Sequence, residues 1–403
     1  MKKYKLGDLL SEFHAGKAIQ TENIKNKGAY PVYGGNGQRG YTDSYNQDGE
    51  YLIIGRQGAY CGNVRYNIGK AYLTEHAIVG QTREDHNPIY IALKLSLMKL
   101  SQLQGQSAQP GLSVNTLSCI SMEMPPKEIQ DKIADIMLKL DRKIELNKQI
   151  NDNLEAMAKQ LYDYWFVQFD FPNEEGKPYK SSGGVMAWNE ELHMNIPYSW
   201  NTCLLNDYIG SNNTGDWGFD EPAEKRNMKV GCIRGADIVK LNDLPTRYIK
   251  DSNTSKLLSV WDIVIEVSGG SPTQATGRSA FVTPGVLKRN GGNLTCSNFC
   301  HAFTMKNYKA SAYFFFMWRM FYDNNNMFNY EGKTSGIKNF MTDTFLANKW
   351  LDVPTALLDL FFERIKVIYE QIDNNIEEIN ALTKQRDELL PLLMNGQAVV
   401  NSD

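Results

Sequence analysis

Apolar residues recur every three or four positions along two stretches of the chain, the spacing expected of a helix that buries one face. The first stretch begins after Pro125 and Pro126, and no proline or glycine interrupts it before Pro172. It predicts a helix over residues 127–166, about 60 Å long at a rise of about 1.5 Å per residue. The expected buried seam has Ile133, Leu140, Asn147, Leu154 and Leu161 at heptad position a, and Ile129, Ile136, Ile150 and Met157 at position d.

A second stretch with the same spacing follows Pro354 and ends near Asn395 and Gly396, a pair suited to a helix C-terminus. Because one chain holds two seams of equal length, we expect the two helices to bury each other as an intramolecular antiparallel coiled coil. Asn147 in the first seam and Asn375 in the second either fix the register or lie in a solvated gap. The second seam has Leu358, Ile365, Ile372, Ile379 and Leu393 at position a, and Phe361, Ile368, Leu382 and Leu389 at position d.

The segments before the two helices share motifs in the same order. Asp48–Gly55 matches Val260–Val267, and the apolar run Ile89–Met98, typical of one buried helix, matches Tyr313–Tyr322. Such matches predict an α+β fold with two strand-rich domains in a pseudo-two-fold repeat, separated by the two long helices. The expected divisions are a first domain over 1–125, a central helix over 126–170, a linker over 171–200, a second domain over 201–353, a C-terminal helix over 354–396 and a tail over 397–403.

The sequence argues against several classes of protein. Its longest apolar run, Tyr313–Tyr322, is about half the length that a membrane-spanning helix needs. The N-terminus lacks the apolar segment of a secretion signal, and the six cysteines form no CxxC pair, so we expect a cytoplasmic protein with reduced thiols. Gly35–Gly40 fits a GxGxxG pattern without the strand and helix that dinucleotide binding requires, and the five histidines lack zinc-site spacing. With no catalytic constellation, we do not expect an enzyme.

Charge separates the domains from the helices. The chain has 43 basic and 46 acidic residues, a net charge of −3 that by itself argues against nucleic-acid binding. Residues 1–125 hold 13 basic and 10 acidic side chains, and residues 203–353 hold 17 and 14, so each domain carries +3. The negative charge lies on the helices and on the segment between the two copies. This distribution favours DNA binding that a partner completes.

Both domains are expected to present polar, glycine-rich loops whose side chains bond base edges and phosphates. The loops cover residues 34–40, 55–65 and 102–113 in the first domain, and residues 211–218, 268–278 and 331–338 in the second. Chosen from position and chemistry, the candidate DNA contacts are Asn36, Gln38, Arg39, Arg56, Gln57, Arg65, Gln109, Trp217, Arg234, Ser271, Gln274, Arg278, Lys333, Thr334 and Lys338.

Six segments of the chain also carry a family resemblance. They are Pro31–Tyr41, Pro125–Ala134, Leu140–Asn147, Leu154–Ala158, Trp165–Asp170 and Arg386–Gly396. Together they resemble the DNA-specificity subunit of type I restriction-modification systems. The resemblance spans nearly the whole chain, is most specific in the helices and is loosest in the second domain.

The resemblance implies two target-recognition domains that each read one half of a bipartite, asymmetric site in double-stranded DNA. It implies a non-catalytic chain that directs two copies of an adenine-N6 methyltransferase subunit and an ATP-dependent endonuclease and translocase subunit. The paired helices would set the distance between half-sites and dock the methyltransferases. S-adenosylmethionine, ATP and magnesium are expected on those partners, with no cofactor on this chain and no membrane. The alternative is a coiled-coil adaptor whose repeat domains bind proteins or carbohydrates.

Overall fold

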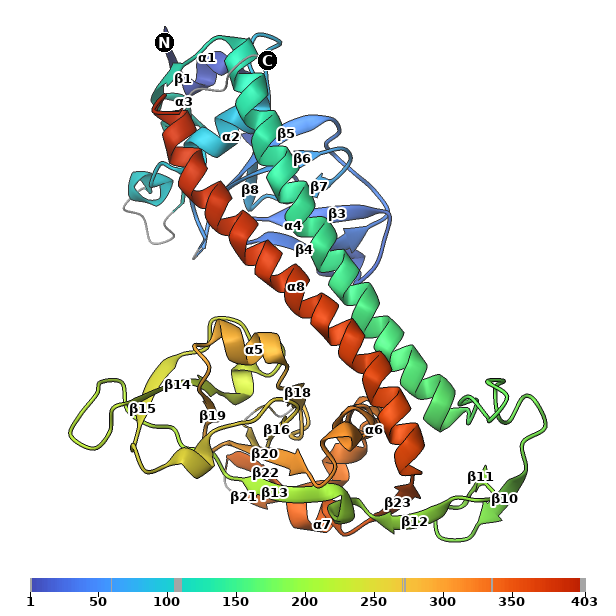
Figure 1. Ribbon diagram of the computed structural model, residues 1–403. Helices are drawn as coiled ribbons and strands as arrows, with labels where there is room; N and C mark the ends of the chain where they lie inside the picture. The colour runs from blue at the N-terminus through green and yellow to red at the C-terminus, as the bar shows by residue number, and fades with distance from the viewer. Residues whose placement is uncertain are drawn as a thin grey trace. The chain divides into compact units, whose positions relative to one another are not determined.

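The computed structural model describes residues 2–398 apart from 59, 105–110, 270, 272 and 335. The chain divides into two compact units: unit 1 is Met1–Leu146 with Ile379–Asp403, and unit 2 is Asn147–Glu378. Each unit contains one strand-rich domain and part of both long helices, α4 (Lys127–Tyr162) and α8 (Thr355–Met394) (Figure 1).

The domain of unit 1 is formed by short strands. They are β1 (Lys2–Lys5), β2 (Leu10–Ala15), β3 (Tyr30–Gly34), β4 (Gly37–Thr42), β5 (Glu50–Gly55), β6 (Val64–Ile68), β7 (Tyr72–Leu73), β8 (Ala77–Thr82) and β9 (Ser121–Met124). A four-stranded antiparallel sheet has the order β2-β8-β5-β6. A three-stranded sheet has the order β4-β3-β7, in which β3 and β7 are parallel, and β1 pairs with β9.

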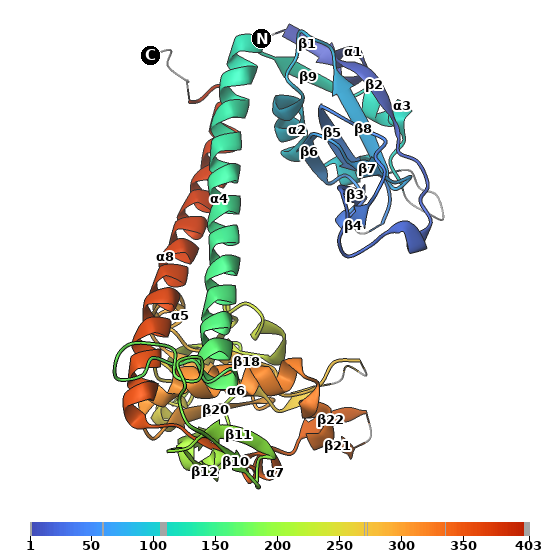
Figure 2. The ribbon, with the colours of Figure 1, turned by 90° about the vertical axis from the view of Figure 1, so that its right-hand side faces the viewer.

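Three shorter helices belong to this domain: α1 (Leu6–Leu9), α2 (Pro88–Ser96) and α3 (Val114–Ser118). The side-chain oxygen of Asn87 caps α2 by accepting hydrogen bonds from the backbone N–H groups of Ile89 (2.9 Å) and Tyr90 (3.0 Å). Nearly all of α2 is buried, which confirms the predicted apolar helix. It packs on β5, β6 and β8 (Figure 2) and shares a hydrophobic cluster with the first turns of α4.

The strands of unit 2 are β10 (Met186–Asn189), β11 (Met194–Pro197), β12 (Asn201–Leu204), β13 (Ile209–Asn213), β14 (Met228–Ile233), β15 (Thr246–Ile249), β16 (Ile263–Glu266), β17 (Ser268–Gly269), β18 (Ser279–Phe281), β19 (Leu294–Cys296), β20 (Cys300–Met305), β21 (Glu331–Thr334), β22 (Ile337–Phe340) and β23 (Lys349–Asp352). The four-stranded sheet β13-β20-β16-β18, the three-stranded sheet β15-β14-β19 with β14 and β19 parallel, and the pair β12-β23 repeat the strand order of unit 1. The predicted internal repeat is therefore confirmed at the level of topology.

Among the described residues, unit 2 has two elements without a counterpart in unit 1, the short helix α5 (Pro284–Arg289) and the hairpin β10-β11. Unit 2 also has the small sheet β17-β22-β21, whereas the described residues of unit 1 have an isolated bridge between Gln57 and Gly111 at the equivalent place. The hairpin lies within residues 171–200, the stretch expected to be a linker. That stretch also places Phe171, Ile196 and Trp200 in the core, with the Phe171 and Trp200 rings stacked 5.1 Å apart. Because Phe171, Ile196 and Trp200 are buried in that core, this stretch is part of the folded unit rather than a free connection.

Aromatic side chains form most of the core of unit 2. Helix α6 (Ser311–Asp323) buries every residue from Tyr313 to Trp318, so the second predicted apolar helix is also confirmed. After Tyr162, α4 continues as a π-helical turn over Asp163–Val167, and α7 (Thr342–Leu346) completes the helices of the domain. The π-helical turn directs Trp165 and Phe166 into the same core as α6.

The two long helices pair with each other inside each unit (Figure 1). In unit 1, Arg386 Nη1 donates to Asp141 Oδ1 at 2.9 Å. In unit 2, Asn147 Nδ2 donates to Glu378 Oε2 at 2.7 Å, and Asn375 Nδ2 donates to Asn151 Oδ1 at 2.8 Å. A residue further along α4 is bonded to a partner that lies earlier in α8, so the two helices run in opposite directions. The predicted antiparallel coiled coil is therefore confirmed.

The seam of α4 differs from the predicted one in its second set of positions. Ile150 and Met157, expected at position d, are 44% and 56% exposed. The buried residues are instead Met137, Ile144 and Ala158, one position later in each heptad. Both the third and the fourth place after the first set are apolar at Ile136 with Met137 and at Met157 with Ala158, so the spacing alone does not decide which place is covered there.

Asn147 and Asn375 are both buried and both bonded across the helix pair, so neither lies in a solvated gap. Asn375 also accepts a hydrogen bond from Gln371 Nε2 at 2.8 Å. Their role in fixing the register remains a prediction that the following substitution addresses.

Asn375→Ala should lower the free energy of unfolding by about 1–3 kcal/mol, because it removes a buried amide and leaves the half-buried Asn151 side-chain oxygen without its donor. Chemical unfolding followed by circular dichroism measures the loss. Asn374→Ala, at the neighbouring exposed position, is the matched control and should change the stability by less than about 0.5 kcal/mol. Equal losses in the two variants would contradict the assignment.

Candidate nucleic-acid interface

The first predicted loop, residues 34–40, is a tight hairpin between β3 and β4. Gly37 at its tip has φ 99°, a backbone conformation that residues with a side chain rarely adopt. Asn36, Gln38 and Arg39 are exposed around this turn. Strand pairing therefore holds the backbone of three candidate residues and leaves their side chains on the surface.

The three predicted loops of unit 1 converge. The carbonyl oxygens of Gln57 and His76 lie so close to the hairpin that a Cβ added to Gly35 would be 3.0 and 2.9 Å from them. At the end of the third loop, the Leu112 N–H donates to the Arg56 carbonyl oxygen at 2.9 Å. The second loop therefore packs against both the hairpin and the end of the third loop, and the described candidate residues of this domain form one cluster.

Three arginines, Arg39, Arg56 and Arg65, give this cluster its positive charge. The side chains of Arg39 and Arg65 form no hydrogen bond or ion pair with another of the described residues. The Arg65 guanidinium lies against the hairpin tip, where a Cβ on Gly37 would collide with it. Burial raises the pKa of the nearby Tyr33 phenol, and the charge of Arg65 opposes that rise. These two guanidinium groups are available to phosphate oxygens or to acceptor atoms of bases.

Two more candidates of this cluster, Arg56 and Gln57, have partners within the chain. Gln57 Oε1 lies 3.2 Å from His76 Nδ1, and His76 Nε2 lies 3.2 Å from Glu75 Oε1. Arg56 Nη1 donates weakly to the Glu75 carbonyl oxygen at 3.4 Å. These contacts orient Arg56 and Gln57 beside the exposed Arg39 and leave both partly accessible.

In unit 2 the candidate Arg278 is held by a carboxylate. Its Nε and Nη2 each donate to Glu266 at 2.7 Å, and Nη2 also donates to the Gly235 carbonyl oxygen at 2.8 Å. The hydrogen bonds to Glu266 raise the pKa of Arg278. The two side chains are 18% and 8% exposed. This geometry favours a role in organising the loop over direct contact with DNA.

Two further candidate cations of unit 2 have internal partners. Arg234 donates to both oxygens of Asp237, from Nε at 2.7 Å and from Nη2 at 2.8 Å. Lys338 Nζ lies 2.9 Å from Glu331 Oε2, and Glu331 Oε1 accepts from the Thr276 N–H at 2.8 Å. These candidate cations are therefore less available to phosphate oxygens than their loop positions suggest.

The remaining candidates are placed as follows. Ser271 is partly buried, and Gln274 is exposed on the same loop. Lys333 and Thr334 belong to β21, but their side chains lie outside the described part of the structure. Gln109 also lies outside the described residues.

Trp217 is an exposed aromatic residue whose ring stacks on an arginine side chain. The Arg247 guanidinium carbon lies 4.5 Å from the centre of its ring, and Arg247 Nε donates to the Trp217 carbonyl oxygen at 2.9 Å. Nearby, Arg226 lies 4.1 Å from the ring centre of the exposed Phe219. Sequence reasoning missed Arg226, Phe219 and Arg247, because no local motif marks an arginine that stacks on a ring from another part of the chain.

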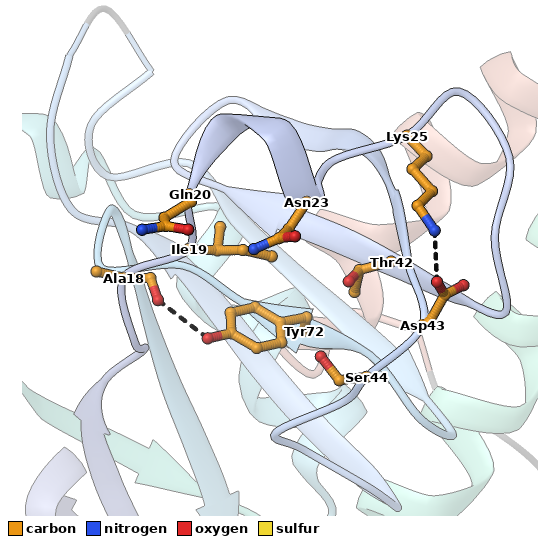
Figure 3. Close-up of a pocket in the computed structure, with 9 residues that line it drawn as sticks. All are labelled: Ala18, Ile19, Gln20, Asn23, Lys25, Thr42, Asp43, Ser44 and Tyr72. Carbon is orange, nitrogen blue, oxygen red and sulfur yellow. Dashed lines mark hydrogen bonds and ion pairs between the residues drawn. The ribbon is translucent and has the colours of Figure 1, made fainter.

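The structure also contains an open cavity of about 470 Å³ in unit 1, outside the predicted loops. It lies among the loop over residues 16–29, the end of β4 and the strand β7 (Figure 3). Its lining consists of Ala18, Ile19, Gln20, Asn23, Lys25, Thr42, Asp43, Ser44 and Tyr72. None of these residues was among the sequence-based candidates.

Buried thiols and metal-ligating groups offer no alternative site. Among the residues that the structure describes, no three His, Cys, Asp or Glu side chains gather as a metal site. Cys296 and Cys300 lie in one hydrophobic cluster, Cys232 is also fully buried, and burial raises the pKa of the Cys232 and Cys300 thiols to about 12. Such thiols are unreactive and pack as small apolar groups.

In the described part of the chain, every helix is too short or too polar to cross a membrane.

Comparison with known proteins gives a consistent set of relatives. A family model described as the type I restriction modification DNA specificity domain matches residues 1–156. The specificity subunit of the type I restriction enzyme EcoprrI from Escherichia coli is 41% identical over 144 residues, which are 35% of this chain and 36% of that protein. The MjaIX specificity subunit from Methanocaldococcus jannaschii is 27% identical over 391 residues, 89% of this chain and 84% of that protein.

Two further comparisons extend this set. A protein of Mycoplasma pneumoniae named as a type I specificity subunit is 30% identical over 165 residues, 39% of this chain and 68% of that protein. The crystal structure of the S subunit of a type I restriction-modification system from M. genitalium matches with a TM-score of 0.60 and 16% identity, over 97% of this chain and 95% of that one. At that identity the structural likeness concerns the fold alone.

Arg278→Leu should lower the free energy of unfolding by about 3–5 kcal/mol, because it leaves the Glu266 carboxylate buried without its partner. Urea unfolding followed by tryptophan fluorescence measures the change. Lys288→Leu is the control, since it breaks an exposed pair with Glu377 and should cost less than about 1 kcal/mol. Adding Glu266→Gln to Arg278→Leu should recover part of the loss, and no recovery would mean that the buried charge is not the cause.

Proposed function

Because this chain belongs to the DNA-specificity subunits of type I restriction-modification systems, we propose that it reads a bipartite, asymmetric sequence in double-stranded DNA. Each strand-rich domain reads one half-site. The observation that carries this proposal is the repeated strand order of the two domains, combined with different side chains on the equivalent loops. One fold with two sets of contacting groups suits a site whose two halves differ in sequence.

The chain directs catalysis that resides on other subunits. Those partners are two copies of an adenine-N6 methyltransferase subunit and an ATP-dependent endonuclease and translocase subunit, which bind S-adenosylmethionine, ATP and magnesium. Family membership supports this assignment. Methylation and restriction then occur where this chain positions the complex on DNA.

Exposed apolar residues on the helix pair of unit 2 support the docking of two methyltransferase copies. On α4, Ile150 and Met157 are exposed and seven residues apart, so they lie on the same face, two helical turns apart. On α8, Leu360 and Val367 have the same spacing and are also exposed. Each helix thus has an apolar stripe that its own partner helix leaves uncovered, and two stripes match two copies of one partner.

The double variant Ile150→Ser with Met157→Ser should weaken binding of the methyltransferase subunit by at least about tenfold per side chain, the loss expected when a buried apolar contact is removed. Co-purification and calorimetric titration measure the effect. Val239→Ser, at an exposed apolar position of the domain, is the control and should bind normally. Because all three positions are exposed, unfolding midpoints should not change, and full binding by the double variant would exclude this stripe as the docking surface.

Replacing residues 1–125 with the corresponding domain of another type I specificity subunit should change one half of the methylated site and leave the other half intact, because each half is read by a separate domain. Sequencing that detects methylated adenine, in cells that also express a methyltransferase partner, gives the site directly. An unchanged site after the exchange would contradict the proposal, and so would a change in both halves.

The aromatic composition of the second domain favoured the adaptor alternative, but the positions of its aromatic side chains in the structure support it less. The aromatic-rich second domain suggested a surface for proteins or carbohydrates, but Tyr313, Phe314, Phe316 and Trp318 are all buried in the core. An electrophoretic shift assay of the chain with a methyltransferase partner separates the two functions. The adaptor would be favoured if no sequence-selective shift appeared.

A further inference from the structure

The loop that leads from the four-stranded to the three-stranded sheet is built alike in both units. It covers residues 16–29 between β2 and β3 in unit 1, and residues 214–227 between β13 and β14 in unit 2, 14 residues in each. A Cβ on Gly16 would collide with the carbonyl oxygen at the end of β7, and a Cβ on Gly215 would collide with the corresponding oxygen at the end of β19. Both loops therefore cross the same strand at the closest approach that a backbone allows.

Each of these loops also extends the three-stranded sheet at its outer edge. In unit 1 an isolated antiparallel bridge joins Lys25 to Tyr41 of β4, and in unit 2 an equivalent bridge joins Phe219 to Tyr248 of β15. The first bridge has a hydrogen bond of 2.8 Å in each direction, and the second has one of 2.9 Å in each direction. The loops are thus fixed scaffolds whose remaining side chains are free to differ.

In unit 1 this scaffold forms one wall of the cavity of Figure 3, which is open and electrically neutral. Its only cation, Lys25, is neutralised by Asp43 at an Nζ–Oδ2 distance of 2.5 Å. The Tyr72 hydroxyl donates to the Ala18 carbonyl oxygen at 3.0 Å, so the ring is held in place. Because phosphate binding uses available cations, this lining does not suit a phosphate.

The groups that remain available in the cavity are uncharged hydrogen-bonding groups. The side-chain amides of Gln20 and Asn23 are exposed and form no hydrogen bond with another of the described residues. Figure 3 shows these amides with Thr42 and Ser44 around the Tyr72 ring. Amides and hydroxyls are the groups that discriminate between base edges, and an aromatic ring offers an apolar contact to a base or to a thymine methyl group.

We propose that this cavity is a second base-reading surface of unit 1, at which Gln20 and Asn23 bond the edge of a nucleobase in the target DNA. The inference rests on the proposed function and adds to it the residues that discriminate bases. The predicted cluster around Arg39 and Arg65 supplies charge, whereas this surface supplies uncharged donors and acceptors.

The equivalent loop of unit 2 supports the assignment through its different chemistry. At the same place in the fold it presents the exposed rings of Trp217 and Phe219, each backed by an arginine. Two exposed aromatic side chains therefore lie on the loop of unit 2, whereas the equivalent loop of unit 1 lines a polar cavity. Two domains that read different half-sites need this kind of variation at an equivalent contact point.

The test compares the full chain, in complex with a methyltransferase partner, with the double variant Gln20→Ala, Asn23→Ala. Binding to a duplex library randomised at the site gives the discrimination at every position. At one or two positions of one half-site, the variant should lose about tenfold or more in discrimination, the value of a bidentate base contact. The slope of affinity against salt should stay unchanged, because no phosphate contact is removed.

Asn26→Ala, Asn115→Ala is the matched control, since it removes two exposed amides of the same domain that do not line the cavity. It should keep full discrimination, and both double variants should unfold at the wild-type temperature. Full discrimination by the Gln20, Asn23 variant would overturn the inference. A uniform loss of affinity over all sequences with a smaller salt slope would also overturn it, because the cavity would then hold a phosphate.

Two further outcomes separate this inference from the function on which it rests. If the wild-type complex itself showed no sequence selectivity, the proposed function would fail, and this inference with it. If free nucleosides bound the wild-type chain and the variant lost only that binding, the ligand would be a nucleoside and not DNA, and the inference alone would fail. Selective wild-type binding that the variant loses at one half-site supports both.

Discussion

In unit 2 the pairing of the long helices and the folding of the domain share one hydrophobic core, and the rest of that unit depends on it. Phe166, from the π-helical turn after α4, lies 4.8 Å from Tyr313 of α6 and 4.9 Å from Phe361 of α8, measured between ring centres. A buried aromatic side chain of this kind contributes about 1.5–3 kcal/mol, and one cluster contains many of them. The helix pair therefore cannot separate without opening the core of the domain, so the orientation of this domain on its helices is set by packing.

The sequence was sufficient to predict those parts of the fold that have a periodic or repeated pattern. The spacing of Ile133, Leu154 and Ile365 predicted both long helices, and the matched motifs predicted two copies of one domain, which the strand orders confirm. The choice between Met157 and the buried Ala158 could not be predicted in this way. Both are apolar, and which one is covered depends on packing against residues far away in sequence.

The candidate site was harder to predict, because its chemistry depends on pairs that form only in the folded chain. Arg278 and Arg65 look alike in the sequence, yet one is neutralised by Glu266 and the other has no ion-pair partner among the described residues. Gln20 and Asn23 belong to no motif, and their position on an edge of the sheet becomes visible only when Lys25 pairs with Tyr41. Residue type and loop position thus selected candidate loops, but predicted neither that those of unit 1 converge nor which side chains remain available.

The charges of unit 2 have a consequence for how such a chain would recognise DNA. Arg234, Arg278 and Lys338 each pair with a carboxylate, so these three cations contribute little counterion release. Under the proposed function, base edges must then supply the discrimination, and the partner subunits must supply most of the affinity for phosphates. Under the proposed function, such a chain would bind arbitrary DNA weakly outside its complex. The net charge of −3, which by itself argued against nucleic-acid binding, is compatible with such a division between subunits.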